Sequence, residues 1–580
     1  MSHTRGAAAP TSGSQDHVTI DESALDRAVN DVAARALEWA ATTPRQRAEL
    51  LERIVADTLA VAEEWNAAAC EAKGYDTWGP EGGEELFGGI GTFVHMAQLF
   101  RRSMLDIARQ GRPRYPGPVR HKPGERIAIQ VVPTSIFDRM LYAGISGEVW
   151  MEPGVSEDDV QSTQAVAYSM PSEHVGVSLV LGAGNVASLG PRDVLTKLFA
   201  EGHVVVLKAN PVNDYLVPYW ERAFASLIGA GYVRVVSGGA QVGAFLVNHD
   251  LITDVHVTGS DKTHDAIVFG VGPEGARRKA ANEPVVTKPI SAELGNVSPV
   301  IIVPGQWTSS EIDYQARHVA TMIANNAGFN CLTPRVIVTH AAWAQREEFF
   351  SALEAVFESL PTREAYYPGA NDRRATFLTA HPDAHEIGAA SAKTLPWTIV
   401  RDVDSSNAQE ICLNVEAFCA LTSETALAGD SPADFVRRAV EFCNDVVWGT
   451  LSMTLICDPR TMKDPETGPA IEQAIADLRY GSIGVNLWHA MSFALASTTW
   501  GAYPGHAITD IQSGSGVVGN AYLFTRAQKS VVRGPFVAKP APVWFATNRN
   551  AGVVMRKLLA FEAAPSWVKL PGLVASSLKG

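Results

Sequence analysis

Val175-Gly176-Val177-Ser178-Leu179-Val180-Leu181 and Val204-Val205-Val206-Leu207 are short apolar runs, and a segment of helical spacing separates them. The alternation continues along the chain. Further strands are predicted at 233–236 and 254–257, with helices at 191–200 and 215–228. Runs rich in β-branched residues that alternate with helices are typical of a parallel sheet covered by helices on both faces. The sequence therefore predicts an α/β protein with a nucleotide-binding type of architecture.

The flanking segments predict further units. The second α/β region is expected from Glu293 to Gly514, with strands at 300–303 and 336–338. On the N-terminal side, Thr43-Pro44-Arg45-Gln46 combines a capping hydroxyl, a proline at the first helical position and a glutamine three residues on, which predicts a helix start. Residues 74–123 are rich in Gly and Pro and are expected to form loops, followed by a strand at 127–132.

Composition narrows the class of protein. The chain has 580 residues and a net charge of −14, and 46% of its residues are hydrophobic and 19% charged. This length and composition fit a folded globular protein with several structural units. The negative net charge argues against a general nucleic-acid role, because binding a phosphate backbone needs a concentrated cationic surface, although a local basic groove stays open. No apolar run of membrane-spanning length occurs, and six cysteines without a C-x-x-C pair predict neither a disulfide framework nor a metal site. We expect a cytoplasmic protein.

One cysteine stands in an unusual context. The sequence has no phosphate loop, no H-E-x-x-H, no G-x-S-x-G and no G-x-G-x-x-G that opens a helix. What remains is Asn325-Asn326-Ala327-Gly328-Phe329-Asn330-Cys331, a cysteine that follows a glycine-containing turn. A free cysteine is most often a small buried apolar residue, so this segment alone does not decide a function.

Six segments together resemble the aldehyde dehydrogenase superfamily in order and approximate spacing, over residues 20–535. They are Val204 to Lys208, Val257 to Ser260, Glu293 to Pro299, Asn326 to Cys331, Glu416 to Phe418, and Leu478 to Asn486. This resemblance implies an aldehyde dehydrogenase-like α/β fold: a parallel-sheet cofactor domain, an α/β catalytic domain and a small oligomerisation element.

The resemblance implies three catalytic residues. Cys331 is similar to the nucleophile, whose thiolate forms the tetrahedral adduct that hydride transfer needs. Asn185 matches the side chain that stabilises the oxyanion, although it could also cap a turn. Glu293 resembles the base that activates water to hydrolyse the thioester, although it could also be an ion-pair partner.

Five residues are similar to the family's NAD or NADP ligands. Lys208 corresponds to a ligand of the ribose hydroxyls, and Gly259 and Ser260 would let the backbone approach the pyrophosphate. Glu416 would hold the nicotinamide ribose, with Phe418 beside the ring. Each also has a plainer interpretation. Lys208 could be a surface cation, and Gly259 and Ser260 could form a common Gly-Ser turn. Glu416 and Phe418 could simply be an acid near a buried aromatic side chain.

Departures from the family pattern indicate a divergent branch. Pro211 stands where the family often has an acid that binds the adenosine ribose, so we expect NADP to be accepted at least comparably to NAD. Ala183-Gly184 replaces the usual Pro-Trp, and the longer segment before Glu293 contains Arg277-Arg278-Lys279, which could assist NADP binding.

The predicted function is oxidation of an aldehyde to a carboxylic acid with NADP or NAD, through a thioester on Cys331. Two alternatives stay open: an acylating enzyme in which CoA accepts the acyl group, and a non-catalytic scaffold that keeps the fold. Glu293 argues against the first, and the presence of both Cys331 and Glu293 argues against the second. The substrate is a small-molecule aldehyde of a kind that the sequence does not identify.

The expected division of the chain is as follows: a disordered tail at 1–17, a cofactor domain at 18–155 and 172–292, a catalytic domain at 293–514, an oligomerisation element at 156–171 and 515–540, and a C-terminal extension at 541–580. Strands are expected in both parts of the oligomerisation element, which would form a homodimer or homotetramer. The extension is expected to cover an apolar surface of its own or a neighbouring subunit, with binding to an anionic membrane as the alternative.

Overall fold

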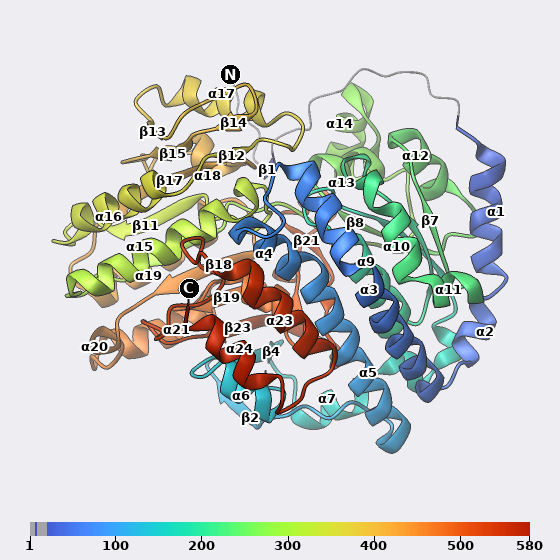
Figure 1. Cartoon of the computed structure of the whole chain (residues 1–580). Helices are drawn as coiled ribbons and strands as arrows, with labels where there is room; N and C mark the ends of the chain where they lie inside the picture. Colours follow the sequence, from blue (N-terminus) through green and yellow to red (C-terminus); the bar gives the residue numbers. More distant parts are fainter. Residues whose placement is uncertain (1–5, 8–19, 580) are drawn as a thin grey trace.

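The computed structural model describes residues 6–7 and 20–579, and it contains two large sheets with helices packed around them (Figure 1). The smaller sheet has six strands in the order β21-β9-β8-β5-β6-β7, and the larger has eleven in the order β13-β15-β17-β11-β10-β18-β19-β23-β4-β3-β2. The predicted α/β class is confirmed.

The six-stranded sheet is the predicted cofactor sheet. Its strands are β5 (Val177–Leu181), β6 (Val204–Lys208), β7 (Val233–Val236), β8 (Asp254–Thr258), β9 (Ile290–Glu293) and β21 (Gly514–Ser515). The first five pair in parallel, and β21 is antiparallel to β9. Because parallel strands end at the same edge of a sheet, the residues that follow β5, β6, β8 and β9 converge there.

Helices cover this sheet. They are α1 (Glu22–Ala33), α2 (Ala36–Ala41), α3 (Pro44–Lys73), α9 (Leu189–Thr196), α10 (Val217–Ala223), α11 (Ala225–Ala230), α12 (Ala240–Asn248), α13 (Asp261–Phe269) and α14 (Gly272–Ala281). The predicted start of the long helix is confirmed, since Thr43 and Gln46 form a capping box.

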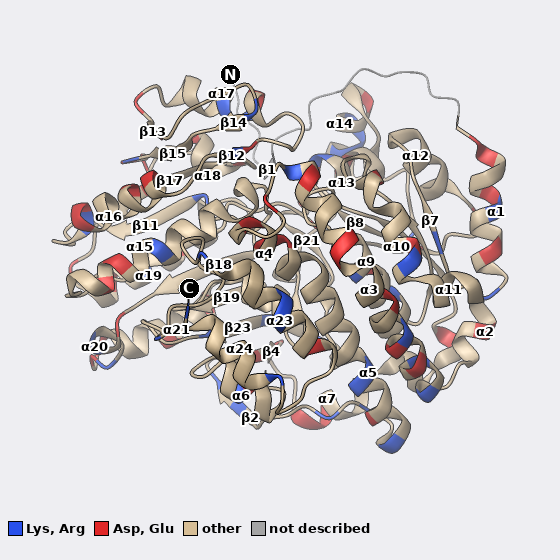
Figure 2. Ribbon diagram, viewed as in Figure 1, with Lys and Arg blue, Asp and Glu red and all other residues tan. Residues whose placement is uncertain are grey.

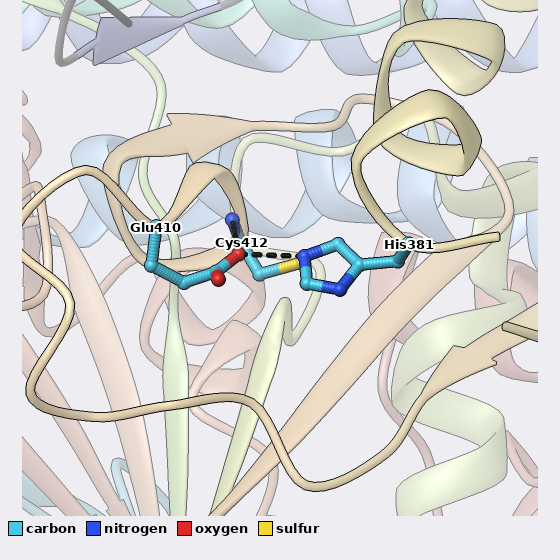
Figure 3. Close-up of side chains that lie close together, drawn as sticks. All are labelled: His381, Glu410 and Cys412. Atoms are coloured by element: carbon cyan, nitrogen blue, oxygen red, sulfur yellow. Dashed lines mark hydrogen bonds and ion pairs between the residues drawn. The ribbon is translucent and has the colours of Figure 1, made fainter. Parts of the chain in front are cut away.

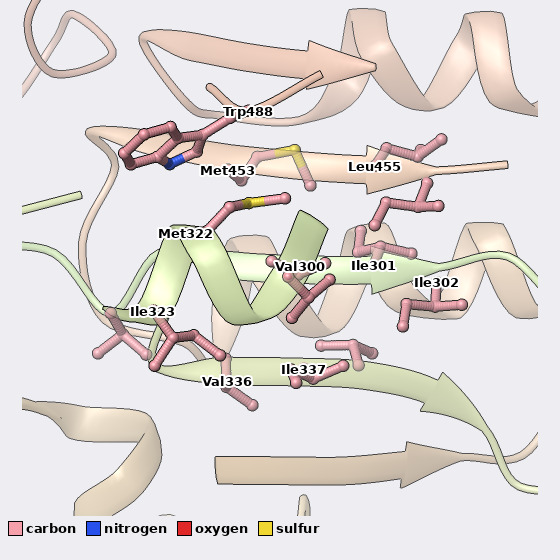
Figure 4. Packing of buried hydrophobic residues seen from close by; sticks show 14 of the residues in the cluster. Val300, Ile301, Ile302, Met322, Ile323, Val336, Ile337, Met453, Leu455 and Trp488 are labelled. Carbon is pink, nitrogen blue, oxygen red and sulfur yellow. The ribbon is translucent and has the colours of Figure 1, made fainter. Parts of the chain in front are cut away.

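The central strands of the larger sheet form the second lobe. They include β10 (Pro299–Ile302), β11 (Val336–His340), β15 (Trp397–Val400), β17 (Leu421–Leu427), β18 (Ser452–Ile456) and β19 (Ser482–Val485). The helix α15 (Ser309–Ala324) packs its Met322 and Ile323 against β10, β11 and β18 (Figure 4). Strands with apolar residues on both faces are typical of a sheet that is covered on both sides.

The loop predicted for residues 74–123 is wrong over much of its length. The chain there forms α4 (Pro80–Leu86), a π-helical turn η1 (Phe87–Gly91) and α5 (Thr92–Gln110). The glycines that suggested a loop serve close helix packing, since a Cβ added at Gly83 would lie 2.6 Å from the backbone of Ala551.

Strands in residues 156–171 were also predicted wrongly, because this segment forms α7 (Glu157–Thr163) and α8 (Val166–Ser169). The strands of this part are β2 (Val119–Lys122), β3 (Arg126–Val132) and β4 (Ser146–Met151). They extend the larger sheet through β23 (Ala527–Arg533), which pairs with β19 on one side and β4 on the other. Assembly through this element stays a prediction.

The predicted N-terminal tail lies mostly outside the described residues. Two of its residues form β1 (Gly6–Ala7), which pairs in parallel with β16 (Val415–Glu416). Among the described residues, no helix has both the length and the apolar composition needed to cross a membrane.

The C-terminal extension folds onto the same chain. The helix α23 (Ala551–Ala563) packs against α4, η1 and α5, and α24 (Leu570–Ser577) packs against α23 (Figure 1). Phe561 is 2% exposed, and its ring contacts Phe137 edge-on at 5.3 Å between centroids. This arrangement fits the expectation that the extension covers an apolar surface of its own subunit.

Truncation of Phe561 tests how firmly the extension is held. Phe561→Ala removes a buried ring, so the free energy of unfolding should fall by about 3–5 kcal/mol. Thermal denaturation would show a lower midpoint for this variant, whereas Val568→Ala, at a side chain that is 89% exposed, should leave the midpoint unchanged. Equal midpoints for Phe561→Ala and the native chain would mean that the extension does not stabilise the fold.

Candidate active site

A strained turn presents Cys331. Between α15 and β11 the chain passes through η5 (Asn325–Gly328), in which Asn326, Ala327 and Gly328 have φ values of 52°, 55° and 78°. A Cβ added at Gly328 would lie 2.5 Å from the carbonyl oxygen of Cys419, so only glycine fits there. Backbone strain of this kind persists where the surroundings hold the chain firmly.

Arg335 holds the turn in place. Its guanidinium is buried and donates hydrogen bonds to the carbonyl oxygens of Gly328, at 2.5 Å, and Cys419, at 2.6 Å. In the fold it links the cysteine turn to the segment that precedes β17.

Cys331 and Glu293 are in direct contact. The Cys331 thiol donates a hydrogen bond of 3.1 Å to Oε1 of Glu293, which is the last residue of β9 and only 3% exposed. Burial raises the pKa of Glu293 to about 7, and hydrogen bonds from Cys331 and Trp500 act in the opposite direction. Burial and the charge of Glu293 also raise the pKa of the Cys331 thiol. The pair is therefore a neutral thiol beside a carboxyl group that titrates near neutral pH.

Asn185 lies against the same turn. It follows β5, is 5% exposed, and its Nδ2 donates a hydrogen bond of 2.8 Å to the carbonyl oxygen of Phe329. Phe329 precedes Cys331 by two residues, so an amide donor lies beside the cysteine segment.

A buried polar cluster fixes this arrangement. Lys73 Nζ donates to Glu85 Oε2 at 2.6 Å, to the carbonyl oxygen of Asn185 at 3.0 Å and to Asn326 Oδ1 at 3.1 Å. The hydroxyl of Tyr366 donates to the same Asn185 carbonyl at 2.9 Å. This cluster could not be predicted from the sequence, because Lys73 ends α3 and resembles an ordinary C-terminal cation of a helix.

Lys208, Gly259 and Ser260 lie at the carboxyl edge of the cofactor sheet. Lys208 is 8% exposed at the end of β6, and burial lowers its pKa to about 8. No described atom lies within 4 Å of a Cβ added at Gly259, so the backbone there is open to an approaching group. The side chain of Ser260 accepts a hydrogen bond from the Thr263 N–H and caps α13.

Glu416 and Phe418 come from the second lobe. Glu416 is 3% exposed, and its Oε1 is buried without a hydrogen-bond partner among the described residues. Burial raises the pKa of Glu416 to about 8, and its charge contributes to the raised pKa of Cys331. The Phe418 ring packs against Tyr367, with 4.9 Å between centroids. The predicted catalytic and cofactor residues thus come from both lobes, and the unpartnered oxygen of Glu416 and the open backbone at Gly259 fit a bound polar cofactor.

Comparison with known proteins agrees with this geometry. Residues 151–373 match the model of the aldehyde dehydrogenase family. Over this segment the chain is similar to aldehyde dehydrogenases. It is 27% identical over 186 residues to aldehyde dehydrogenase LUC3 from Fusarium sp, a match that covers 30% of this chain and 36% of that one. The matched part of the chain spans about a third of the length of these curated relatives.

Solved structures share the fold over most of the chain. Aldehyde dehydrogenase KauB from Pseudomonas aeruginosa has a TM-score of 0.60 at 15% identity, and the match covers 92% of this chain and 96% of that one. Indole-3-acetaldehyde dehydrogenase in complex with NAD+ has a TM-score of 0.59 at 16% identity, and the match covers 92% and 97%.

The structure adds two observations to the expected cofactor contacts. Pro211 stands three residues after Lys208 as predicted, but Asp214, in the 3-10 helix η4 (Pro211–Leu216), interacts with the charge of Lys208. The acceptance of NADP stays a prediction, and Asp214 would oppose it. The basic run of α14 is blue in Figure 2. It has local partners: Arg277 pairs with Glu274 and Glu283, and Lys279 pairs with Asp265.

A separate cluster of His381, Glu410 and Cys412 brings together three side chains of the types that bind metals (Figure 3). Its contacts are those of a helix cap. Glu410 Oε1 lies 2.7 Å from His381 Nε2 and accepts a hydrogen bond of 3.0 Å from the Cys412 N–H. Burial raises the pKa of the Cys412 thiol, which disfavours the thiolate that a metal would need.

The raised pKa of Glu293 predicts how a substitution changes stability with pH. The pKa of Glu293 is about 7 in the folded protein, above the ordinary value of 4.5, so folding favours the protonated carboxyl group. The resulting stability is fully present below pH 4.5 and is lost as the pH rises through 7. Glu293→Gln should therefore gain thermal stability relative to the native chain between pH 5 and pH 8. Denaturation scans across this range would measure the difference between the two midpoints.

Glu274→Gln is the matched control. This exposed carboxylate pairs with Arg277 and has a pKa lowered to about 2, so its loss should not stabilise the protein at any of these pH values. A midpoint difference for Glu293→Gln that stays constant from pH 5 to pH 8 would contradict the raised pKa.

Proposed function

We propose that the protein oxidises an aldehyde to a carboxylic acid with NAD+ or NADP+, through a thioester on Cys331. The observation that carries this proposal is the 3.1 Å hydrogen bond from the Cys331 thiol to Glu293, at the edge where the cofactor sheet meets the second lobe. A nucleophile in hydrogen-bond contact with a buried base is the arrangement that covalent catalysis requires.

The first step forms the tetrahedral adduct. Glu293 accepts the thiol proton, the sulfur of Cys331 bonds to the aldehyde carbon, and the carbonyl oxygen takes up the negative charge. Asn185 Nδ2 and the backbone N–H of Cys331 are the donors proposed for that oxygen. At present Asn185 Nδ2 donates to the carbonyl oxygen of Phe329, so the amide has to exchange this bond for one to the substrate.

The second half of the cycle releases the acid. NAD(P)+ would supply the oxidising chemistry as the hydride acceptor, and the acyl group would then remain on Cys331 as a thioester. Glu293 then loses its proton, takes a proton from water, and the hydroxide bonds to the acyl carbon while the carbon–sulfur bond breaks. Cys331 recovers its proton, and the carboxylic acid departs. A pKa of about 7 suits Glu293 to both uses.

The cofactor would lie along the carboxyl edge of β5, β6, β8 and β9. We assign the ribose hydroxyls of the adenosine to Lys208, the pyrophosphate to the backbone at Gly259 and Ser260, and the nicotinamide ribose to Glu416, with Phe418 beside the ring. Support comes from the unpartnered Oε1 of Glu416 and from the NAD+ complex of the similar indole-3-acetaldehyde dehydrogenase.

Two substitutions separate the roles of the catalytic pair. Cys331→Ala should abolish aldehyde oxidation, because the other five cysteines are buried away from this contact. Glu293→Gln should still form the thioester but should hydrolyse it about a hundredfold more slowly. Rapid mixing should then show a burst of reduced cofactor, and mass spectrometry of the quenched enzyme should show the acyl group on the Cys331 peptide.

Cys443→Ala is the control for loss of a thiol, since Cys443 is buried in α19 (Pro432–Asp445) and should not be needed for activity. Full activity of Cys331→Ala, or an acyl group on another cysteine, would refute the mechanism. Rescue of Glu293→Gln by CoA would favour the acyl-CoA alternative, and absence of any oxidation by the native chain would favour a scaffold.

Asp214 provides a test of cofactor choice. A carboxylate near Lys208 repels a 2′-phosphate, so Asp214→Asn should raise kcat/KM for NADP+ relative to NAD+ by about tenfold. Steady-state rates with both cofactors measure this ratio, and Asp250→Asn, at an exposed position, is the control. An unchanged ratio would mean that Asp214 does not face the adenosine ribose.

A further inference from the structure

Arg192 is a buried cation whose hydrogen-bonding groups are only partly used. It lies in α9 and is 2% exposed. Its Nη2 donates to the carbonyl oxygen of Phe493 at 2.6 Å, and the guanidinium lies 3.6 Å from the centroid of the Phe493 ring. Within the described part of the chain, Nε and Nη1 are buried without a hydrogen-bond partner.

This state is costly, because a buried charge normally needs an ion partner and filled hydrogen bonds. Two other buried cations have ion partners: Lys73 pairs with Glu85 at 2.6 Å, and Lys197 pairs with Asp254 at 2.7 Å. Arg192 has neither, and burial lowers its pKa to about 9. An anion bound at Nε and Nη1 would supply both a counter-charge and the missing hydrogen-bond acceptors.

A chain of contacts connects Arg192 to the Cys331–Glu293 pair. Phe493, which lies under the guanidinium, belongs to α22 (Ala490–Leu495), and its ring packs edge-on against Trp500 at 5.7 Å between centroids. Trp500 hydrogen-bonds to Glu293, and the charge of Arg192 acts on Glu293 directly. A path of contacts therefore leads from Arg192 to the carboxyl group that holds the Cys331 thiol.

The two carboxyl groups near Arg192 are engaged elsewhere. Asp193 Oδ2 accepts a hydrogen bond of 2.9 Å from Thr258, and Glu293 Oε1 accepts from Cys331. Burial raises the pKa of Asp193 to about 8 and that of Glu293 to about 7, so neither provides a full negative charge at neutral pH. Among the described residues, no fully ionised carboxylate therefore pairs with Arg192, and a bound anion would supply the missing counter-charge.

We propose that Arg192 binds a carboxylate of the substrate, so that the preferred aldehydes carry a carboxylate group in addition to the aldehyde. This inference rests on the proposed function and specifies its substrate class. The Phe493 ring fixes the plane of the guanidinium, and Nε and Nη1 form the two-pronged edge that a carboxylate can contact with both oxygens.

Paired substrates test the proposal. The native chain would be assayed with 4-oxobutanoate and 6-oxohexanoate and with the methyl ester of each. At least one free acid should have a kcat/KM about a hundredfold above that of its ester, because removal of the partner of a buried charge loses this much affinity. Arg192→Met should abolish the preference, and Arg192→Lys should restore part of it, since lysine offers a single point of charge.

Arg47→Met is the matched control. Arg47 is also 2% exposed and also lies over an aromatic ring, that of Trp39, but it belongs to α3 and donates to the Trp39 carbonyl. Its loss should leave the ratio of acid to ester unchanged. Thermal midpoints of all variants would show whether each protein is folded.

A second measurement does not depend on turnover. Succinate or adipate should slow alkylation of Cys331 by iodoacetamide in the native chain and in Arg47→Met, but not in Arg192→Met. Esters oxidised as well as acids, or equal protection in Arg192→Met, would refute the role of Arg192 and leave the proposed function intact. Failure of the native chain to oxidise any of these aldehydes, with protection retained, would refute the proposed function alone.

Discussion

The contact between the Cys331 thiol and Glu293 is the interaction on which the rest of the site depends. Glu293 ends a strand of the cofactor sheet, whereas Cys331 precedes a strand of the larger sheet. The hydrogen bond therefore forms only when the two lobes are packed in one relative position. The turn at 325–328 places Cys331 for this contact, and Arg335 and the Lys73 cluster hold the turn. Three consecutive residues of the turn have positive φ, which is a strained conformation.

Burial sets the chemistry of this contact. Glu293 and Glu416 are both 3% exposed, and desolvation is the main cause of the raised pKa of each. A carboxylate in water would be ionised at pH 7 and too weak a base for a thiol. The same burial leaves Arg192 with an incompletely solvated charge close by. A bound substrate with its own carboxylate would neutralise that charge while it places the aldehyde in the site.

The errors in the sequence-based interpretation have specific physical causes. The helix α5 was missed because Gly79 to Gly91 gave the region the composition of a loop, although Phe93, Phe100 and Ile107 repeat at seven-residue spacing and are buried. Those glycines allow the close approach of α23, a helix more than 450 positions away in the chain. The segment 156–171 forms helices instead of the expected strands, and β4 at 146–151 is the strand that pairs with β23. Pairing with β23 and with the predicted strand at 126–132 decides which segment extends the sheet.

The sequence by itself determined the alternation of strands and helices and the helix start at Thr43, because these features depend on local spacing. The candidate residues Asn185, Lys208, Gly259, Glu293 and Cys331 came from the resemblance of their segments to the aldehyde dehydrogenase superfamily, and their roles stay predictions. Tertiary structure alone decided which side chains lie near them. Asp214 is six residues beyond Lys208 yet interacts with its charge, Lys73 reaches Asn185 across 112 positions, and Arg192 is left without an ion partner. Burial and unpaired charge depend on how whole elements pack, and local sequence does not encode them.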